Sequence, residues 1–111
     1  MSESSVIDKI EKGKQVGGRL WTEIEGVKYY ESAGIQKWGQ AYRVGLTKIA
    51  EENMVQEIFE VDEVKEFSTL SEAIEYLTDN SSITFESMNT SKGQKIFNPD
   101  VIYSEKGNIW D

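Results

Sequence analysis

Residues 41–77 read AYRVGLTKIAEENMVQEIFEVDEVKEFSTLSEAIEYL and carry the clearest structural signals in this chain of 111 residues. Apolar and other side chains alternate from 41 to 49, which is typical of a half-buried strand. After turn-compatible residues at 51–53, the segment 54–61 is richer in apolar residues and predicts a strand covered on both faces. We expect these two strands to form an antiparallel pair.

A helix start signal follows. Thr69 and Glu72 fit a capping box, in which the Thr hydroxyl accepts a hydrogen bond from the third helical amide. Apolar residues then recur at three- and four-residue spacing and make one stripe: Leu70, Ala73, Ile74 and Leu77. These signals predict a helix over about 70–79 that packs on one face of the sheet.

Weaker signals lie before this stretch. Residues 5–8 fit a second capping box and Gly13 is a typical helix stop, so an N-terminal helix and a flexible connection are expected within residues 1–18. Residues on either side of Glu25-Gly26 alternate, and this pattern predicts the two strands of a hairpin: 19–25 and 27–32.

The remaining segments are less regular. Residues 33–40 hold two glycines and no apolar period, so we expect a loop there, with Trp38 exposed or folded back as a lid. After the central helix we expect a short strand with Ile83 and Phe85 inward, a turn-rich segment, a second short strand and a terminal hairpin, over these ranges: 83–88, 89–93, 94–97, and 101–103 with 109–110.

These elements predict a single domain, residues 1–111, of the α+β class. The expected architecture is a mostly antiparallel sheet of about five to seven strands with two helices. A parallel pair at one edge of the sheet is an alternative.

The composition limits the function. The chain has no Cys and no His, which excludes a disulfide scaffold or thiolate metal site and removes the commonest general base. Nothing distinguishes any pair of carboxylates as catalytic, so we expect no enzyme, no catalytic residues, no metal and no cofactor. No apolar run approaches the roughly 20 residues that cross a bilayer, and the N-terminus lacks a signal peptide. We therefore expect a small bacterial-type cytoplasmic protein without a membrane partner.

The net charge of −8 is unevenly distributed. Residues 9–48 hold eight Lys or Arg against four Glu, whereas residues 49–111 hold four Lys against fourteen Asp or Glu. Such asymmetry concerns partners and solubility rather than the fold.

The acidic half leads to the first hypothesis, a non-enzymatic protein-binding module, with an inhibitor or immunity-type function against a basic partner as its sharper form. Trp38 is an expected aromatic anchor. The expected partner-binding carboxylates are Glu57, Glu60, Asp62, Glu63 and Glu66. The competing interpretation is a solvated face that keeps a small protein soluble.

The alternative function is single-stranded nucleic-acid binding, in which bases stack on aromatic rings and cations neutralise phosphates. The residues expected to share this sheet surface are Arg19, Trp21, Lys28, Tyr30, Trp38 and Arg43. The competing and favoured interpretation of these aromatic residues is ordinary cross-strand packing, and the acidic half opposes phosphate binding. Self-association through the edge of the terminal hairpin is a third possibility.

Overall fold

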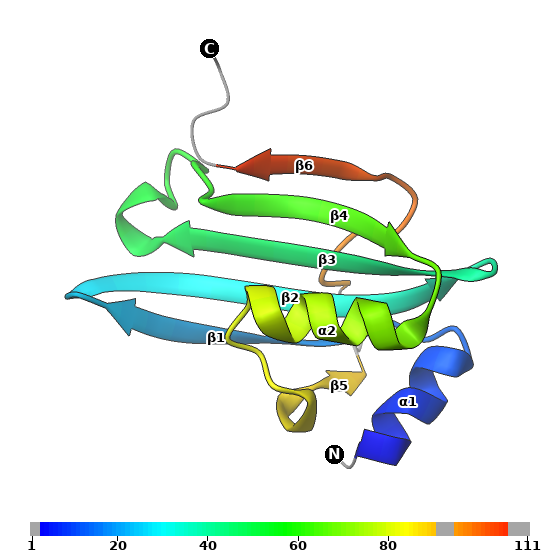
Figure 1. The fold of residues 1–111 in the computed structure, drawn as a ribbon. Helices are drawn as coiled ribbons and strands as arrows, with labels where there is room; N and C mark the ends of the chain where they lie inside the picture. Colours follow the sequence, from blue (N-terminus) through cyan, green and yellow to red (C-terminus); the bar gives the residue numbers. More distant parts are fainter. Residues whose placement is uncertain (1–2, 91–94, 107–111) are drawn as a thin grey trace.

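A computed structural model describes residues 3–90 and 95–106. Four long antiparallel strands form the body of the sheet: β1 Val16–Ile24, β2 Val27–Trp38, β3 Ala41–Ala50 and β4 Val61–Phe67. Two short strands, β5 Asn89–Thr90 and β6 Tyr103–Lys106, extend the edges and give the order β5-β1-β2-β3-β4-β6 (Figure 1). The predicted α+β class, with a mostly antiparallel sheet and two helices, is confirmed. The body of the sheet has fewer strands than the five to seven expected.

The central helix is α2, Leu70–Asn80, and it packs on one face of the sheet as predicted (Figure 1). Thr69 caps it, because its hydroxyl accepts a hydrogen bond from the Glu72 amide at 3.2 Å. Ala73 and Leu77 of the apolar stripe are buried in the core. The cap and the stripe therefore act as the sequence indicates.

The N-terminal helix α1, Glu3–Glu11, begins slightly before the predicted cap and buries Val6 and Ile10. Gly13 follows with a φ of 88°, a left-handed conformation that glycine adopts without strain. The expected flexible connection up to residue 18 is wrong, because β1 already begins at Val16 and Gln15 is buried.

The β1–β2 hairpin turns at Glu25 and Gly26, as predicted. Their φ values of 50° and 82° fit a type I′ turn, which matches the twist of the flanking strands. The predicted loop over 33–40 is wrong, because β2 continues to Trp38 before the next tight turn. The sequence does not predict this part of the strand, because its buried residues include the small Ala33 and Gly34, which produce no apolar alternation.

The predicted strand over 54–61 is also wrong. The short 3₁₀ turn η1, Glu51–Asn53, leads into a further turn in which the Val55 side chain is 93% exposed. The strand that pairs with β3 is β4, which begins at Val61. The sequence of β4 is rich in charged residues and so lacks the apolar pattern of a strand. One of these charged residues, Glu63, is nevertheless buried in the core.

After α2 the expected short strand over 83–88 is replaced by a second 3₁₀ turn, η2 Phe85–Ser87, although Ile83 is buried as predicted. The expected strand over 94–97 is irregular where it is described. In place of the first strand of the terminal hairpin, β6 begins at Tyr103 and pairs with β4. Residues 109–110 lie outside the described residues.

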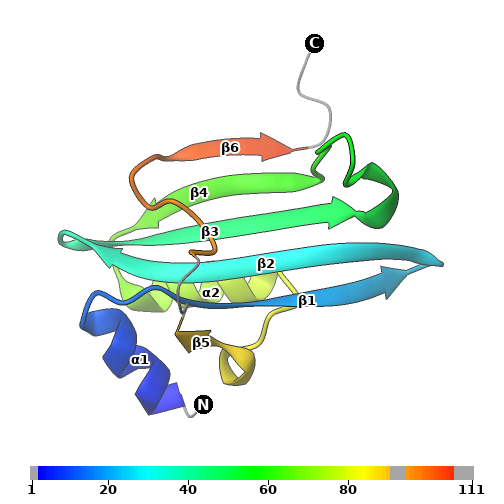
Figure 2. The ribbon, with the colours of Figure 1, turned by 180° about the vertical axis from the view of Figure 1, so that it is seen from behind.

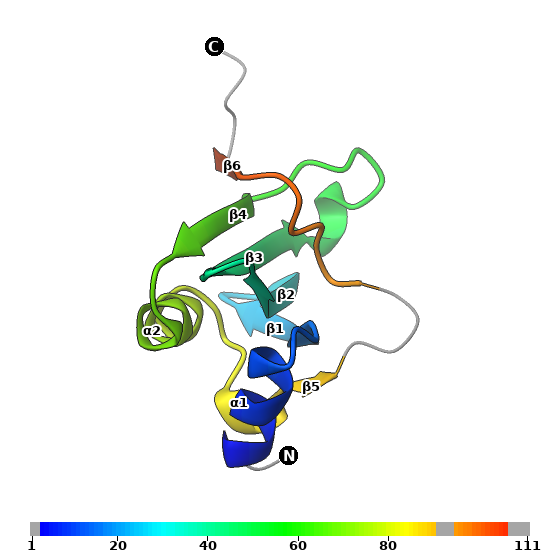
Figure 3. The same cartoon turned by 90° about the vertical axis from the view of Figure 1, so that its right-hand side faces the viewer.

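Residues 95–101, here called the C-terminal strap, cross the sheet face opposite α2 (Figure 2, Figure 3). Beneath the strap, Gly17, Gly34 and Gly45 stand directly opposite one another on β1, β2 and β3. Phe97 packs on Gly34 and Gly45, while Ile96 packs on Gly17, and a Cβ atom on Gly45 would lie 2.2 Å from the Phe97 Cγ. The row therefore makes room for an aromatic ring.

The strap is also fixed by polar contacts. The Gln15 side chain donates to the Phe97 carbonyl at 2.9 Å and accepts from the Ile96 amide at 2.6 Å. Because Gln15 is buried, these bonds form away from water. They satisfy backbone groups of the strap that a neighbouring strand would otherwise pair.

Candidate functional site

The sheet has two unlike faces, and the register decides which residues share each one. We call the face opposite α2 the open face. The strap covers only the part of the open face around the glycine row. The rest of the open face consists of residues of β1–β3 near the Glu25-Gly26 turn. The 3₁₀ turn η1 and the segment after it lie on this side of the sheet, away from α2 (Figure 3).

Trp21 and Tyr30 meet in this uncovered part of the open face. They are direct partners in the β1–β2 register, and their ring centroids are 5.0 Å apart. The Trp21 side chain is 52% exposed. Lys28 and Arg19 lie on the same face, two residues along their strands from Tyr30 and Trp21. The sheet thus brings together four of the six expected aromatic and basic residues.

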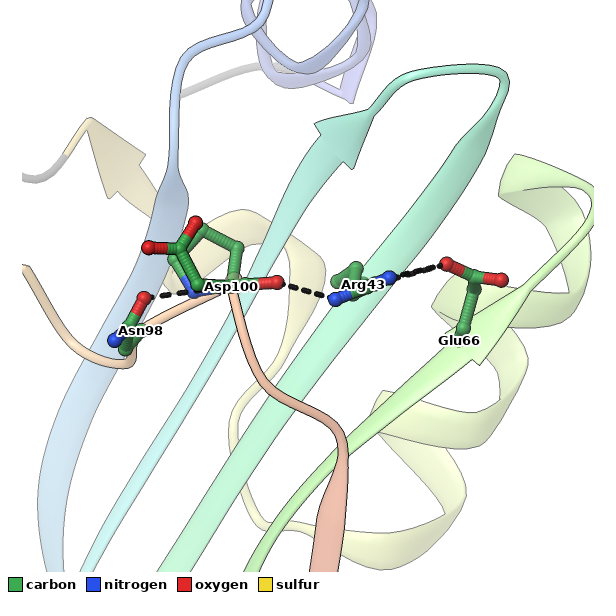
Figure 4. A network of polar contacts seen from close by, with 5 residues as sticks. Arg43, Glu66, Asn98 and Asp100 are labelled. Atoms are coloured by element: carbon green, nitrogen blue, oxygen red, sulfur yellow. Dashed lines mark hydrogen bonds and ion pairs between the residues drawn. The ribbon is translucent and has the colours of Figure 1, made fainter.

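Arg43 does not join them, although it lies on the same face. Its Nε donates to Glu66 at 2.8 Å, and its Nη1 donates to the Pro99 carbonyl at 2.6 Å (Figure 4). Asn98 accepts a hydrogen bond from the Asp100 amide at 3.0 Å and so orders the turn around Pro99. The Arg43 guanidinium therefore holds the strap onto β3 and β4.

Trp38 is also separate from the Trp21–Tyr30 pair. It ends β2, eight residues beyond Tyr30, which places it about 26 Å away along the strand. Gly34 and the ring of Phe97 lie between the two positions. The expected single aromatic platform is therefore interrupted by the strap.

The five expected partner-binding carboxylates are dispersed. Glu57 and Glu60 are exposed in the segment before β4, whereas Asp62 accepts from the Tyr103 hydroxyl at 2.7 Å. Glu66 is engaged with Arg43. Because Glu63 is buried on the other face of β4, the five carboxylates do not form one continuous surface.

The prediction that Glu63 binds a partner is wrong, because its side chain is only 1% exposed and lies on the α2 face. It accepts a hydrogen bond from the Tyr76 hydroxyl. Burial and this hydrogen bond raise the pKa of Tyr76 well above its usual value. Glu63 therefore supports the packing of α2 and is inaccessible to a partner.

A second buried carboxylate, Glu31, also has a structural role. It accepts hydrogen bonds from the Thr22 hydroxyl at 2.8 Å and from the Ser82 amide and hydroxyl, both at 3.0 Å. These bonds tie the chain after α2 to the β1–β2 hairpin. Both buried carboxylates are thus held by hydrogen bonds within the fold.

A mixed-charge groove, here called the tip groove, lies between the β1–β2 turn and η1. One depression of about 450 Å³ and a neighbouring one of about 480 Å³ share two of their lining residues, Lys28 and Glu51. The two depressions are lined by Trp21, Thr22, Glu23, Gly26, Val27, Lys28, Glu51 and Glu52. The groove therefore combines one indole and three carboxylates with a single ammonium group.

Sequence reasoning did not select Glu23, Glu51 or Glu52 as site residues. Glu51 and Glu52 lie just after β3, and β3 ends beside the start of β2. The antiparallel order of these strands is the signal that places both carboxylates beside the hairpin turn.

In the described ranges, no group of three or more acidic side chains is arranged to hold a metal ion, and neither helix has both the length and the apolarity to span a bilayer. In comparisons with known proteins, no family model, no curated protein and no solved structure matches this chain. Its function is therefore inferred from its own residues.

Proposed function

We propose that this protein is a non-enzymatic binding module whose tip groove holds a basic segment of a partner protein. The observation that carries the proposal is the position of the half-exposed Trp21 ring in a groove that three carboxylates line. A Lys or Arg side chain over the face of an exposed Trp gains about 0.5–1 kcal/mol, and nearby carboxylates add charge-assisted hydrogen bonds.

The same composition favours a basic peptide over a nucleic acid. Glu23 and Glu51 line the same depression as the exposed Trp21 ring, and Glu52 lines the neighbouring one, so these carboxylates repel phosphate groups. Arg43 is engaged with the strap and Glu66, so it is not available to bind a phosphate. The net charge of −8 adds a general attraction for a basic partner and a repulsion for nucleic acid.

An inhibitor or immunity-type role is the form that this function takes if the basic partner is itself an enzyme. In this proposal the partner-binding surface is the tip groove and not the five carboxylates expected from the sequence.

The test measures fluorescence anisotropy with two labelled probes, an oligoarginine peptide and single-stranded oligo(dT). The variant Glu51→Lys/Glu52→Lys reverses the charge of the groove, and Glu75→Lys/Asp79→Lys makes the same change on exposed positions of α2. We expect the groove variant to bind the peptide about tenfold more weakly, or about 1.4 kcal/mol. The α2 variant should lose much less.

Two outcomes would contradict the proposal. Equal losses in both charge-reversal variants would show that net charge alone attracts the peptide. Tighter binding of oligo(dT) than of the peptide, lost on Trp21→Ala, would replace the protein-binding function with nucleic-acid binding.

A further inference from the structure

The outer edge of β1 is open beyond its first residues. β5 pairs only with Val16 and Gly17. Among the residues that the structure describes, no strand pairs with the outer side of 19–24, where β1 runs toward the Glu25-Gly26 turn (Figure 1). This edge contains no Pro, and Ile24 beside the turn is 48% exposed. Natural sheets usually protect such an edge.

The turn type fixes which backbone groups face outward. In a two-residue hairpin the residues beside the turn, here Ile24 and Val27, exchange both backbone hydrogen bonds. Hydrogen-bonded pairs then alternate along the ladder. The N–H and C=O groups of Trp21 and Glu23 therefore point away from β2, toward the open side.

We propose that a second copy of the chain pairs with this edge, antiparallel to β1 and related by a two-fold axis at Thr22. In this register Trp21 lies opposite Glu23 of the second copy, so the outward backbone groups of both residues form hydrogen bonds. The two sheets join into one through residues 20–24 of each copy. The two-fold axis makes every contact occur twice, apart from that between the two Thr22 residues on the axis.

The side chains in this register are complementary. On the α2 face, Ile24 of one copy covers the half-buried Leu20 of the other, which gives the exposed isoleucine an apolar neighbour. At the ends of the paired segment, Arg19 lies opposite Glu25 of the second copy. No two like charges stand directly opposite each other, and the opposite charges favour this register.

The register also fits the strand end. The outer side of Val16 and Gly17 is already paired with β5. The second copy can therefore pair only from about Arg19 onward, and its β1–β2 turn must lie beside Arg19. Pairing about Thr22 places Glu25 of the second copy at that position. The paired segment is short, and stable interfaces bury about 1,200–2,000 Å². The dimer is therefore weak and depends on concentration. This inference does not rest on the proposed function.

Sedimentation equilibrium over a wide concentration range tests the dimer. The average mass of the wild type should rise from 12.6 kDa toward twice that value. Ile24→Lys should weaken the association about tenfold or more, because it replaces an apolar contact that occurs twice. Val55→Lys is the matched control, since Val55 is exposed outside this edge. Thermal unfolding checks that both variants remain folded.

A charge exchange tests the register. Arg19→Glu and Glu25→Lys should each weaken self-association, because like charges then meet at both ends of the paired segment. An equimolar mixture of the two variants should recover a dimer, since both ends are again complementary. The proposal is overturned by a wild type that stays monomeric, by a dimer that Ile24→Lys leaves intact, or by a mixture that shows no recovery.

Discussion

The two faces of the sheet are covered by different means. On the α2 face, a capped helix buries an apolar stripe and places Tyr76 over the carboxylate of Glu63. On the open face, an irregular strap packs Ile96 and Phe97 on a row of three glycines and leaves the region around Trp21 uncovered. A helix covers a face through its own periodicity, whereas the strap depends on residues contributed by three strands. The incompletely covered face is the one that offers a binding groove.

The largest expected effect comes from removing the ring that anchors the strap. Phe97→Ala should lower the free energy of unfolding by about 3–5 kcal/mol, because it deletes a buried aromatic side chain and leaves a cavity on the glycine row. Chemical denaturation measures this loss. A loss of about 0.5 kcal/mol or less, typical of a surface substitution, would show that the strap contributes little to covering the open face.

On the other face, Tyr76→Phe removes the hydroxyl that donates to the buried Glu63. Hydrogen bonds to charged groups contribute about 1.5–3 kcal/mol, so we expect a loss of that size in the free energy of unfolding. Thr78→Val is a suitable comparison, because the Thr78 hydroxyl is exposed and bonds only its own helix. An equal loss of free energy of unfolding in both variants would mean that the hydrogen bond to Glu63 adds no stability beyond that of an exposed hydroxyl.

The glycine row allows a sharper comparison within the sheet. Gly45→Ala should cost about 1–3 kcal/mol by overpacking, because the added Cβ would overlap the Phe97 side chain. Gly18→Ala is the matched control, since its Cβ would meet the nearest atom at an ordinary 3.5 Å. We expect this control to be neutral or slightly stabilising. Equal denaturation midpoints for the two variants would contradict close packing of the strap on Gly45.

The difference between the faces also explains what the sequence predicts. The helix is predictable because Thr69, Glu72 and the apolar stripe are close together in the chain. The strap is not, because Gln15 bonds Phe97 across 82 positions, and the glycine row exists only once the strands are in register. Local signals identify elements, but they do not reveal which distant segment fills a groove.

The candidate site follows the same rule. Alternation along β1 and β2 correctly places Trp21 and Tyr30 on one surface. It cannot show that Arg43 is engaged with the strap, because Pro99 lies 56 positions away. The charged character of Glu63 predicted exposure, whereas its hydrogen bond with Tyr76 allows its burial.

The smallest expected effect is a pH dependence that separates the two faces. The raised pKa of Tyr76, caused by burial and by the bond to Glu63, means that the folded protein retains this phenolic proton above pH 10, where the unfolded chain releases it. The stabilisation is complete below pH 10 and is lost as the pH rises further, by at most about 1.4 kcal/mol per pH unit for one group.

Denaturation curves of the wild type and Tyr76→Phe between neutral and alkaline pH measure this contribution by difference. The variant should lose less stability above pH 10 than the wild type does. It should keep some dependence, because the bond to Glu11 and partial burial also raise the pKa of Tyr42. Phe97→Ala removes no ionisable group and leaves the hydrogen bond from Tyr76 of α2 to Glu63 intact, so its alkaline slope should match the wild type. A flattened slope in Phe97→Ala would mean that the strap and α2 do not stabilise their two faces independently.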